Sequence, residues 1–319
     1  MRKKIVIIAS ALIFTIVSIW AFNAPEASIE ANDNHITCED TCVTHTTDNT
    51  LKQQAHFSSK DSLTICALLD EARRQPQTAG QTLFFARKFI GRPYVAHTLE
   101  LPGEERLVVE TTRLDCTTLV ETVTALTMCA ARRLYTFQDY LDALMSLRYR
   151  EGRLDGYTSR LHYFSDWIED KESMGITTEI QSPVPPFTGV QKLNIYYMSA
   201  HPDSYRALRA NPSLVKEIKE QEQRLTGKTY RYIPKSSVTN TRLMRATVKD
   251  GDIIAITCNK KGLDIAHLGF AVWRDDGLHL LNASMLHKKV VEEPLTLYKY
   301  LQQHPSHTGI RIIRLNETR

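Results

Sequence analysis

Hydrophobic residues recur at helical spacing through the first two thirds of the chain. The first such pattern begins at Asp61, which we take as an N-cap, and its apolar positions run to Ala72. A second predicted helix covers 83–90 and ends before Gly91, and a third follows Cys116. Further helical patterns cover 137–149, 161–169 and 190–226.

The pattern changes after Lys249, where short β-branched or alternating runs are separated by turn residues. Asp275-Asp276-Gly277, between two of these runs, is a hairpin turn signal. Helices first and a strand meander last indicate an α+β fold. The predicted strands are 253–256, 268–273, 278–281, 289–291 and 310–314, with an earlier short strand at 107–110.

The N-terminus has the pattern of an export signal. Arg2, Lys3 and Lys4 precede an uncharged run, residues 5–22, that small residues follow. Because the apolar segment of a signal usually has ~7–15 residues, this longer run also fits an uncleaved membrane anchor. In either case the body lies outside the cytoplasm. We expect a signal peptide or anchor at 1–24, a polar leader at 25–58, and a single catalytic domain at 59–319 with a helical insertion at about 135–230.

Charge and composition exclude two classes of protein. The 319 residues include 40 Lys+Arg and 36 Asp+Glu, for a formal net charge of +4. Removing residues 1–24 takes away three basic residues (40 − 3 = 37 against 36), so the apparent basicity belongs to the export signal. We therefore expect no nucleic-acid partner. With 42% hydrophobic and 8% aromatic residues, the chain can bury a sizeable core, which argues against intrinsic disorder.

The six cysteines permit disulfides in an exported protein, although their pairing cannot be read from the sequence. Cys38 and Cys42 have histidines nearby at a spacing that imitates a zinc site, but we interpret their segment as leader, with or without a bond between them. Cys129 and Cys258 lie in apolar surroundings and are expected in the core. Cys116 differs from all of these.

Cys116 falls where an extended segment meets the start of a predicted helix. There the helix dipole stabilises a thiolate, and unpaired amides of the first turn can bind an oxyanion. Such a nucleophile needs a base, usually histidine, with a polar group that orients the ring. The sequence has no signature of phosphate-loop, serine-hydrolase, zinc-protease or dinucleotide chemistry.

His267 is the best candidate for the base, because it opens a predicted strand and can project from the strand end. The adjacent predicted strand carries Asn282, which a hairpin can bring near His267. The order is Cys116, then His267 after 151 residues (267 − 116), then Asn282 after 15 more (282 − 267). This order is papain-like. Spacing alone also fits a purely structural interpretation, in which Cys116 is a buried residue and His267 is a strand residue with satisfied hydrogen bonds.

Five short motifs, in order, resemble those of the NlpC-type papain-like cell-wall hydrolases. They are 91–95 (Gly-Arg-Pro-Tyr-Val), 114–118 (Leu-Asp-Cys-Thr-Thr), 251–254 (Gly-Asp-Ile-Ile), 267–269 (His-Leu-Gly) and 282–284 (Asn-Ala-Ser). Residues 114–121 and 157–167 are more narrowly similar to a subfamily of N-acetylmuramoyl-L-alanine amidases from Gram-negative bacteria. The resemblance covers about residues 62–315.

The resemblance implies a papain-like fold of NlpC type, in which N-terminal helices carrying the nucleophile pack on a C-terminal antiparallel sheet. It implies a triad of Cys116, His267 and Asn282, with Asn where the wider family often has His. It also places Tyr94 and Asp115 on the substrate side of the site. No metal or cofactor is expected.

In the insertion, we expect further contacts with substrate. A muropeptide needs a surface for its sugar and cations for its stem-peptide carboxylates. Tyr157, Ser159 and Arg160 offer both, whereas the helical spacing of Tyr163 and Trp167 favours packing in the core.

The implied function is an amidase that releases the stem peptide from 1,6-anhydro-N-acetylmuramic acid in the periplasm. We expect a monomer whose partner is the muropeptide, with membrane contact only through an uncleaved anchor. Two alternatives remain open at this point. One is a D-glutamyl–diamino-acid endopeptidase of the same fold, and the other is a catalytically idle wall-binding protein.

Overall fold

The computed structural model describes residues 54–75 and 80–316, and all of these belong to one compact unit. The expected signal peptide or anchor, residues 25–53 of the leader, and Cys38 and Cys42 lie outside the described residues. Within the described part, no helix has the length and apolar character needed to cross a bilayer.

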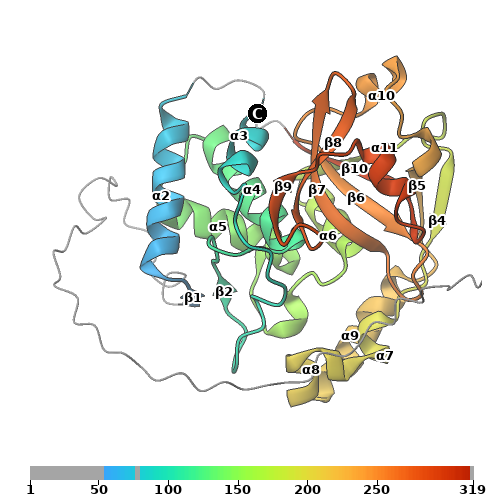
Figure 1. The fold of residues 1–319 in the computed structure, drawn as a ribbon. Helices are drawn as coiled ribbons and strands as arrows, with labels where there is room; N and C mark the ends of the chain where they lie inside the picture. The colour runs from blue at the N-terminus through green and yellow to red at the C-terminus, as the bar shows by residue number, and fades with distance from the viewer. Residues whose placement is uncertain (1–53, 76–79, 317–319) are drawn as a thin grey trace, which may run out of the picture. The chain divides into compact units, whose positions relative to one another are not determined.

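The predicted N-terminal helices are present, and they gather beside the sheet in Figure 1. They are α2 (Ser59–Arg73), α3 (Gln81–Lys88), α4 (Cys116–Ala131), α5 (Phe137–Arg148) and α6 (Phe164–Ser173). Helix α4 is buried along nearly its whole length, since α2, α3 and α5 pack around it. Its sequence, which is apolar and Thr-rich apart from Glu121, suits this central position.

The expected N-cap of the first helix is wrong by one turn. Ser58 is the N-cap of α2, and Asp61 occupies the third helical position of a capping box with it. The Asp61 carboxylate also accepts hydrogen bonds from the amide and hydroxyl of Thr111, both at 2.8 Å. Asp61 therefore ties the start of α2 to the segment that leads to Cys116.

An antiparallel sheet fills the C-terminal half of the fold, in the strand order β4-β5-β10-β6-β7-β8-β9, with β3 also paired to β10. Arg274 pairs with Gly277, so the predicted turn at 275–276 closes the β7–β8 hairpin. All five predicted C-terminal strands are present. The bounds are β3 (Thr177–Ile180), β4 (Gly189–Lys192), β5 (Thr229–Pro234), β6 (Ile253–Cys258), β7 (Ile265–Arg274), β8 (Gly277–Ser284), β9 (Lys289–Glu292) and β10 (His307–Leu315).

We had expected a helical insertion at about 135–230, but this segment is not wholly helical. It contains β3 and β4, which join the sheet beside β10 and β5, and a continuous helix over 190–226 is replaced by shorter ones. The end of the expected leader is also part of the fold, because β1 (Ala55–His56) pairs in parallel with β2 (Leu107–Val108). The short helices are α7 (Tyr197–Ala200), α8 (Arg206–Ala210) and α9 (Ser213–Leu225).

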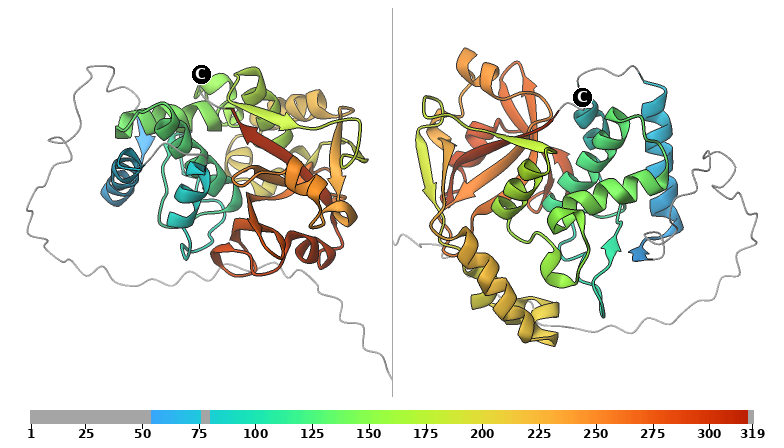
Figure 2. Two further views of the ribbon diagram at one scale, coloured as in Figure 1. Left: turned by 90° about the horizontal axis from the view of Figure 1, so that it is seen from above. Right: turned by 180° about the vertical axis from the view of Figure 1, so that it is seen from behind.

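The sheet separates two hydrophobic cores. On β8, Leu281 and Ala283 face the core around α4, whereas Leu278 and Leu280 face the core under α11 (Leu297–Gln302). This alternation follows from the two-residue period of a strand. Figures 1 and 2 show α2–α5 and α11 on different sides of the β6–β8 strands. A third core lies among α7, α8 and α9.

Candidate active site

Cys116 is the first residue of α4, as its sequence context predicted. Asp115 is the N-cap, and its carboxylate accepts hydrogen bonds from the Thr118 amide at 2.8 Å and the Thr118 hydroxyl at 2.9 Å. The Thr118 hydroxyl also accepts from the Asp115 amide at 2.9 Å, which completes a capping box. The carboxylate of Asp115, predicted to lie on the substrate side, thus holds the turn that carries the nucleophile candidate.

The thiol of Cys116 reaches the strand that carries His267. Hydrogen bonds from the Leu268 amide and the Thr117 side chain stabilise a thiolate there, but burial and then the negative charge of Asp115 outweigh them. The pKa of Cys116 is raised to about 12. We had expected the helix N-terminus to produce a resting thiolate. It does not, because desolvation is the larger effect on the pKa. The residue rests as a thiol.

His267 and Asn282 are brought together by the β7–β8 hairpin. The His267 Nε2 atom lies 3.0 Å from the Asn282 Oδ1 atom, and the Asn282 Nδ2 donates to the Leu280 carbonyl at 3.3 Å. Because Oδ1 can only accept, Nε2 carries the hydrogen and Nδ1 of the neutral ring is a free acceptor. Burial, together with the charge of His304, lowers the pKa of His267 against the opposing bond to Asn282.

A glycine makes this close pairing of strands feasible. Gly269 lies opposite Asn282 in the register that pairs Phe270 with Leu281. A Cβ atom at Gly269 would lie 2.7 Å from the Leu281 carbonyl oxygen and 2.8 Å from the Leu280 Cγ atom. The His-Leu-Gly motif is thus explained sterically at its third position.

Tyr94 lies next to the Cys116 turn, held by main-chain bonds on both sides. Its amide donates to the Lys288 carbonyl at 2.9 Å, and it forms a parallel bridge with Leu114. Burial, then the charges of Cys116 and Asp115, raise the pKa of Tyr94 to about 12. Its phenol therefore stays protonated and can donate a hydrogen bond near the thiol.

The three predicted residues of the insertion make internal contacts. Arg160 binds Glu105 with two nitrogens, at 2.8 and 2.6 Å, and Glu100 at 2.8 Å, and its guanidinium lies over the Tyr157 ring. The Ser159 hydroxyl donates to the Gly156 carbonyl at 2.7 Å. Arg160, 8% exposed, is thus not a free cation for a substrate carboxylate. It fixes the 99–105 segment that follows Tyr94.

Sequence reasoning missed several groups around His267. The rings of His304 and His307 stack with their centroids 4.7 Å apart. The charge of His304 lowers the pKa of His267, and the charge of His267 contributes to lowering the pKa of His307. Glu293, one residue beyond β9, is also buried on this side. The only sequence signal was their position after the Asn282 strand, which does not distinguish them from solvated residues. Trp167 and Tyr163 are buried in the cores, as predicted.

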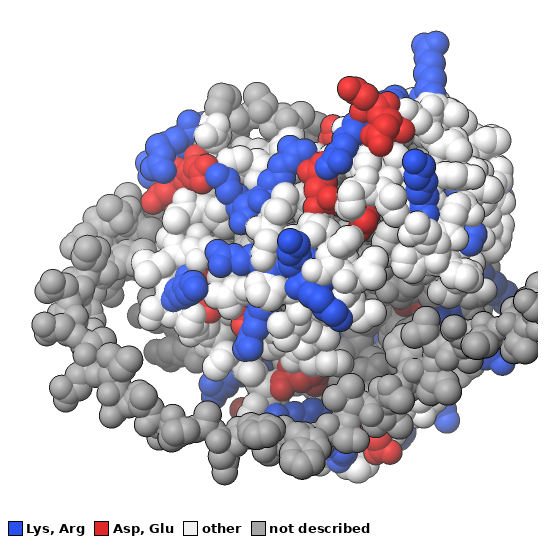
Figure 3. Space-filling model, in the orientation of Figure 1, with Lys and Arg blue, Asp and Glu red and all other residues white. Residues whose placement is uncertain are grey.

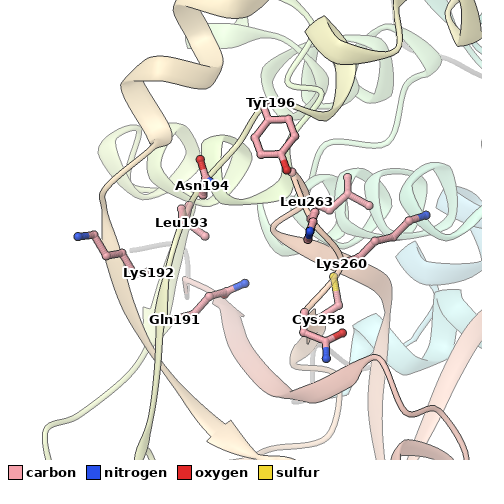
Figure 4. A pocket seen from close by; sticks show the side chains of 11 residues that line it. Gln191, Lys192, Leu193, Asn194, Tyr196, Cys258, Lys260 and Leu263 are labelled. Atoms are coloured by element: carbon pink, nitrogen blue, oxygen red, sulfur yellow. The ribbon is translucent and has the colours of Figure 1, made fainter.

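A separate polar cavity of about 440 Å³ lies at the β6–β7 turn (Figure 4). Lys192, Lys260, Tyr196 and Cys258 are among its lining residues, and Cys116, His267 and Asn282 are not. The cavity is therefore separate from the residues that the sequence predicted as a triad. Cys116, Cys129 and Cys258 carry free thiols, and within residues 54–75 and 80–316 no group of acidic, His and Cys side chains is arranged to hold a metal ion.

The comparisons with known proteins agree with an amidase. Residues 84–310 match the AmiA-like family, described as N-acetylmuramoyl-L-alanine amidase-like. A crystal structure of an N-acetylmuramoyl-L-alanine amidase from Bacteroides uniformis is 41% identical, with a TM-score of 0.69 over 74% of this chain and 97% of that one. A Bacteroides fragilis protein named as a xylanase is 39% identical, with a TM-score of 0.68 over 73% and 100% of the two chains.

A more distant likeness concerns the fold alone. A Legionella pneumophila protein is 23% identical, with a TM-score of 0.60 over 81% of this chain and 96% of that one. No protein of curated function matches the chain. The family match spans more than half of the 319 residues, so the chain belongs to the AmiA-like family of N-acetylmuramoyl-L-alanine amidase-like proteins.

Proposed function

We propose that the protein is a cysteine amidase that cuts the bond between the lactyl group of N-acetylmuramic acid and L-alanine. The observation that carries this proposal is the alignment of His267 by Asn282, with the next residue, Leu268, donating to the Cys116 thiol. A nucleophile, a base and an orienting amide are the parts of a papain-like NlpC-type triad. The AmiA-like family and the amidase neighbour support the choice of bond.

The reaction starts from a neutral pair, because the pKa of Cys116 is raised and the pKa of His267 is lowered. As the Cys116 sulfur attacks the lactyl carbonyl carbon, its proton moves to Nδ1 of His267. The Cys116 amide, at the first helical position, and the Tyr94 phenol donate hydrogen bonds to the developing oxyanion. In this mechanism Asn282 accepts the Nε2 hydrogen and so leaves Nδ1 available for the proton of the thiol.

Collapse of this intermediate breaks the carbon–nitrogen bond. His267 gives its proton to the leaving alanine nitrogen, so the stem peptide departs with a free amino group and a thioester remains. His267 then takes a proton from water as the hydroxide oxygen attacks the thioester carbonyl. The Cys116 sulfur leaves and regains the proton. The second product is N-acetylmuramic acid with a free lactyl carboxylate.

We propose soluble muropeptides in the periplasm as substrates, with the 1,6-anhydro sugar as the preferred form. The signal or anchor at 1–24 would deliver the protein to that compartment, and we propose that it acts as a monomer. These details rest on the sequence resemblance described above.

Mass spectrometry of digests of defined anhydro and reducing muropeptides tests the proposed bond. Release of free sugar acid and intact stem peptide is expected. A sugar–dipeptide product would instead assign the D-glutamyl–diamino-acid cut, and no product would favour a binding protein. Cys116→Ala should abolish hydrolysis, whereas Cys258→Ala, which changes a buried thiol of β6, should retain it. Full activity of Cys116→Ala would rule out the proposed nucleophile.

A further inference from the structure

A buried carboxylate lies on the same side of the sheet as His267 and Asn282. Glu293 is 1% exposed, and its amide donates to the Leu280 carbonyl at 2.8 Å. One carboxylate oxygen lies 3.2 Å from the His287 Nε2 atom. The other oxygen, Oε2, has no hydrogen-bond partner in the described structure. Such a buried, half-satisfied acid calls for a physical explanation.

The strand register shows what Glu293 faces. Asn282 pairs with Val291, and the amide bond to Leu280 continues that register to Glu293. Residues two apart on a strand share a face, so Glu293 lies beside Asn282 rather than behind the sheet. On β7, His267 shares the face of Ala271, which pairs with Leu280. Glu293, Asn282 and His267 therefore belong to one layer, under α11.

We propose that Glu293 is a positioning residue that stabilises the imidazolium of His267 during the reaction. Asn282 orients the ring but carries no charge to offset the proton that the ring accepts from Cys116. In a buried layer, a carboxylate acts on that proton with little screening from solvent. This inference rests on the proposed amidase mechanism, because that mechanism is what makes His267 charged.

Charged groups on the surrounding elements also change the pKa of His267, some raising it and some lowering it. The charges of Asp115 and Glu293 raise the pKa of His267, and the charge of His304 lowers it. Further titratable groups close to this layer include Cys116 of α4, Tyr94, His287 of the β8–β9 turn, Tyr300 of α11 and His307 of β10, while Tyr298 and Lys299 of α11 are exposed. Asp115 is half-buried and uses its Oδ1 atom in the α4 capping box, whereas Glu293 is 1% exposed and its Oε2 atom is buried without a partner.

The full chain with Glu293→Gln tests this role, with Glu292→Gln as the matched control. Glu292 is the adjacent residue but lies on the opposite face, where it pairs with Arg274 and Arg87. Side-chain NMR titration should show the pKa of His267 falling by about one unit in Glu293→Gln, since a nearby negative charge is removed. The same variant should lose at least about tenfold in kcat with little change in KM.

The titration is independent of turnover, so it still decides the matter if the amidase proposal itself fails. An unchanged pKa of His267 in Glu293→Gln, or an equal shift in Glu292→Gln, would overturn the proposal. If Glu293→Gln does not fold, Glu293→Asp keeps the charge and should leave both the pKa and kcat closer to the parent. A folded Glu293→Asp that loses kcat with no change in the pH profile would also overturn it.

Discussion

At the scale of single residues, the site differs from the thiolate–imidazolium pair that a helix N-terminus suggests. Burial favours the uncharged forms of both Cys116 and His267. In the proposed mechanism, the thiolate therefore forms only as the substrate is attacked. A resting thiol of raised pKa is also less reactive toward oxidants and alkylating agents, because the thiolate is the reactive form.

This neutral pair predicts the pH dependence of activity. His267 must be neutral to accept the proton, and since its pKa is lowered, the acidic limb of kcat/KM should lie below the ordinary histidine value of ~6.5. Because the pKa of Cys116 is about 12, activity should stay level from neutral pH to at least pH 9. Steady-state kinetics across pH 4–10 measure this. A narrow bell around neutrality would contradict it.

The site residues that could be predicted from sequence are those with distinctive chemistry in a distinctive place. Cys116 precedes a helix, and His267 and Asn282 lie on consecutive strands. Glu293 could not be found in this way, because Glu292 beside it is the same residue type and faces the other side of the strand. Only the register separates the two.

At the scale of elements, helix α4 links fold and chemistry through its cap. Asp115 stabilises the first turn by its bonds to Thr118, while its charge raises the pKa of Cys116. These two effects have opposite consequences for a reactive thiol. The side chain is therefore needed for position even though its charge opposes ionisation.

Asp115→Asn separates the two effects, because asparagine caps a helix about as well as aspartate. The pKa of Cys116 should fall, and the rate of alkylation by iodoacetamide at pH 8 should rise while unfolding is nearly unchanged. Asp115→Ala should also lower the free energy of unfolding by about 1 kcal/mol. Alkylation kinetics with urea denaturation measure both. Slower alkylation of Asp115→Asn would contradict this assignment of the charge.

Most helices and the β6–β9 strands were predictable because their signals are local. Apolar periodicity marks α4 and α5, and the turn at 275–276 marks the β7–β8 hairpin. The strands β3 and β4 were missed because each has only four residues, and because β3 has only two buried positions and β4 has none. They are strands only through their partners β10 and β5, which lie far away in sequence.

At the scale of the whole described molecule, ion pairs join parts that are separate in sequence. Arg311 of β10 binds Glu179 of β3 and the Ser165 hydroxyl of α6, all buried. Arg160 similarly joins the insertion to the 99–105 segment. On the face drawn in Figure 3, basic side chains are more widespread than acidic ones, but both signs are present. The charges thus act mainly as local links.

The Arg160 link predicts a loss of stability when it is cut. Removing one member of a buried ion pair costs about 3–5 kcal/mol, because the partner carboxylates are left without their counter-charge. Arg160→Ala should therefore lower the free energy of unfolding by this amount, measured by urea denaturation. Arg160→Lys keeps the charge but not the two-nitrogen contact with Glu105, and should lose less. A stable Arg160→Ala with a raised KM would instead restore the substrate contact expected from sequence.

The position of β10 has a consequence for how the protein is made. This strand is the last element of the described chain, yet it pairs with β3, β5 and β6 and so lies at the middle of the sheet. A nascent chain that has not yet reached residue 307 lacks the strand that joins the insertion to the hairpin of His267 and Asn282. Folding of the part that carries His267 and Asn282 must therefore follow synthesis of β10. Premature termination would yield a chain without activity rather than one with partial activity.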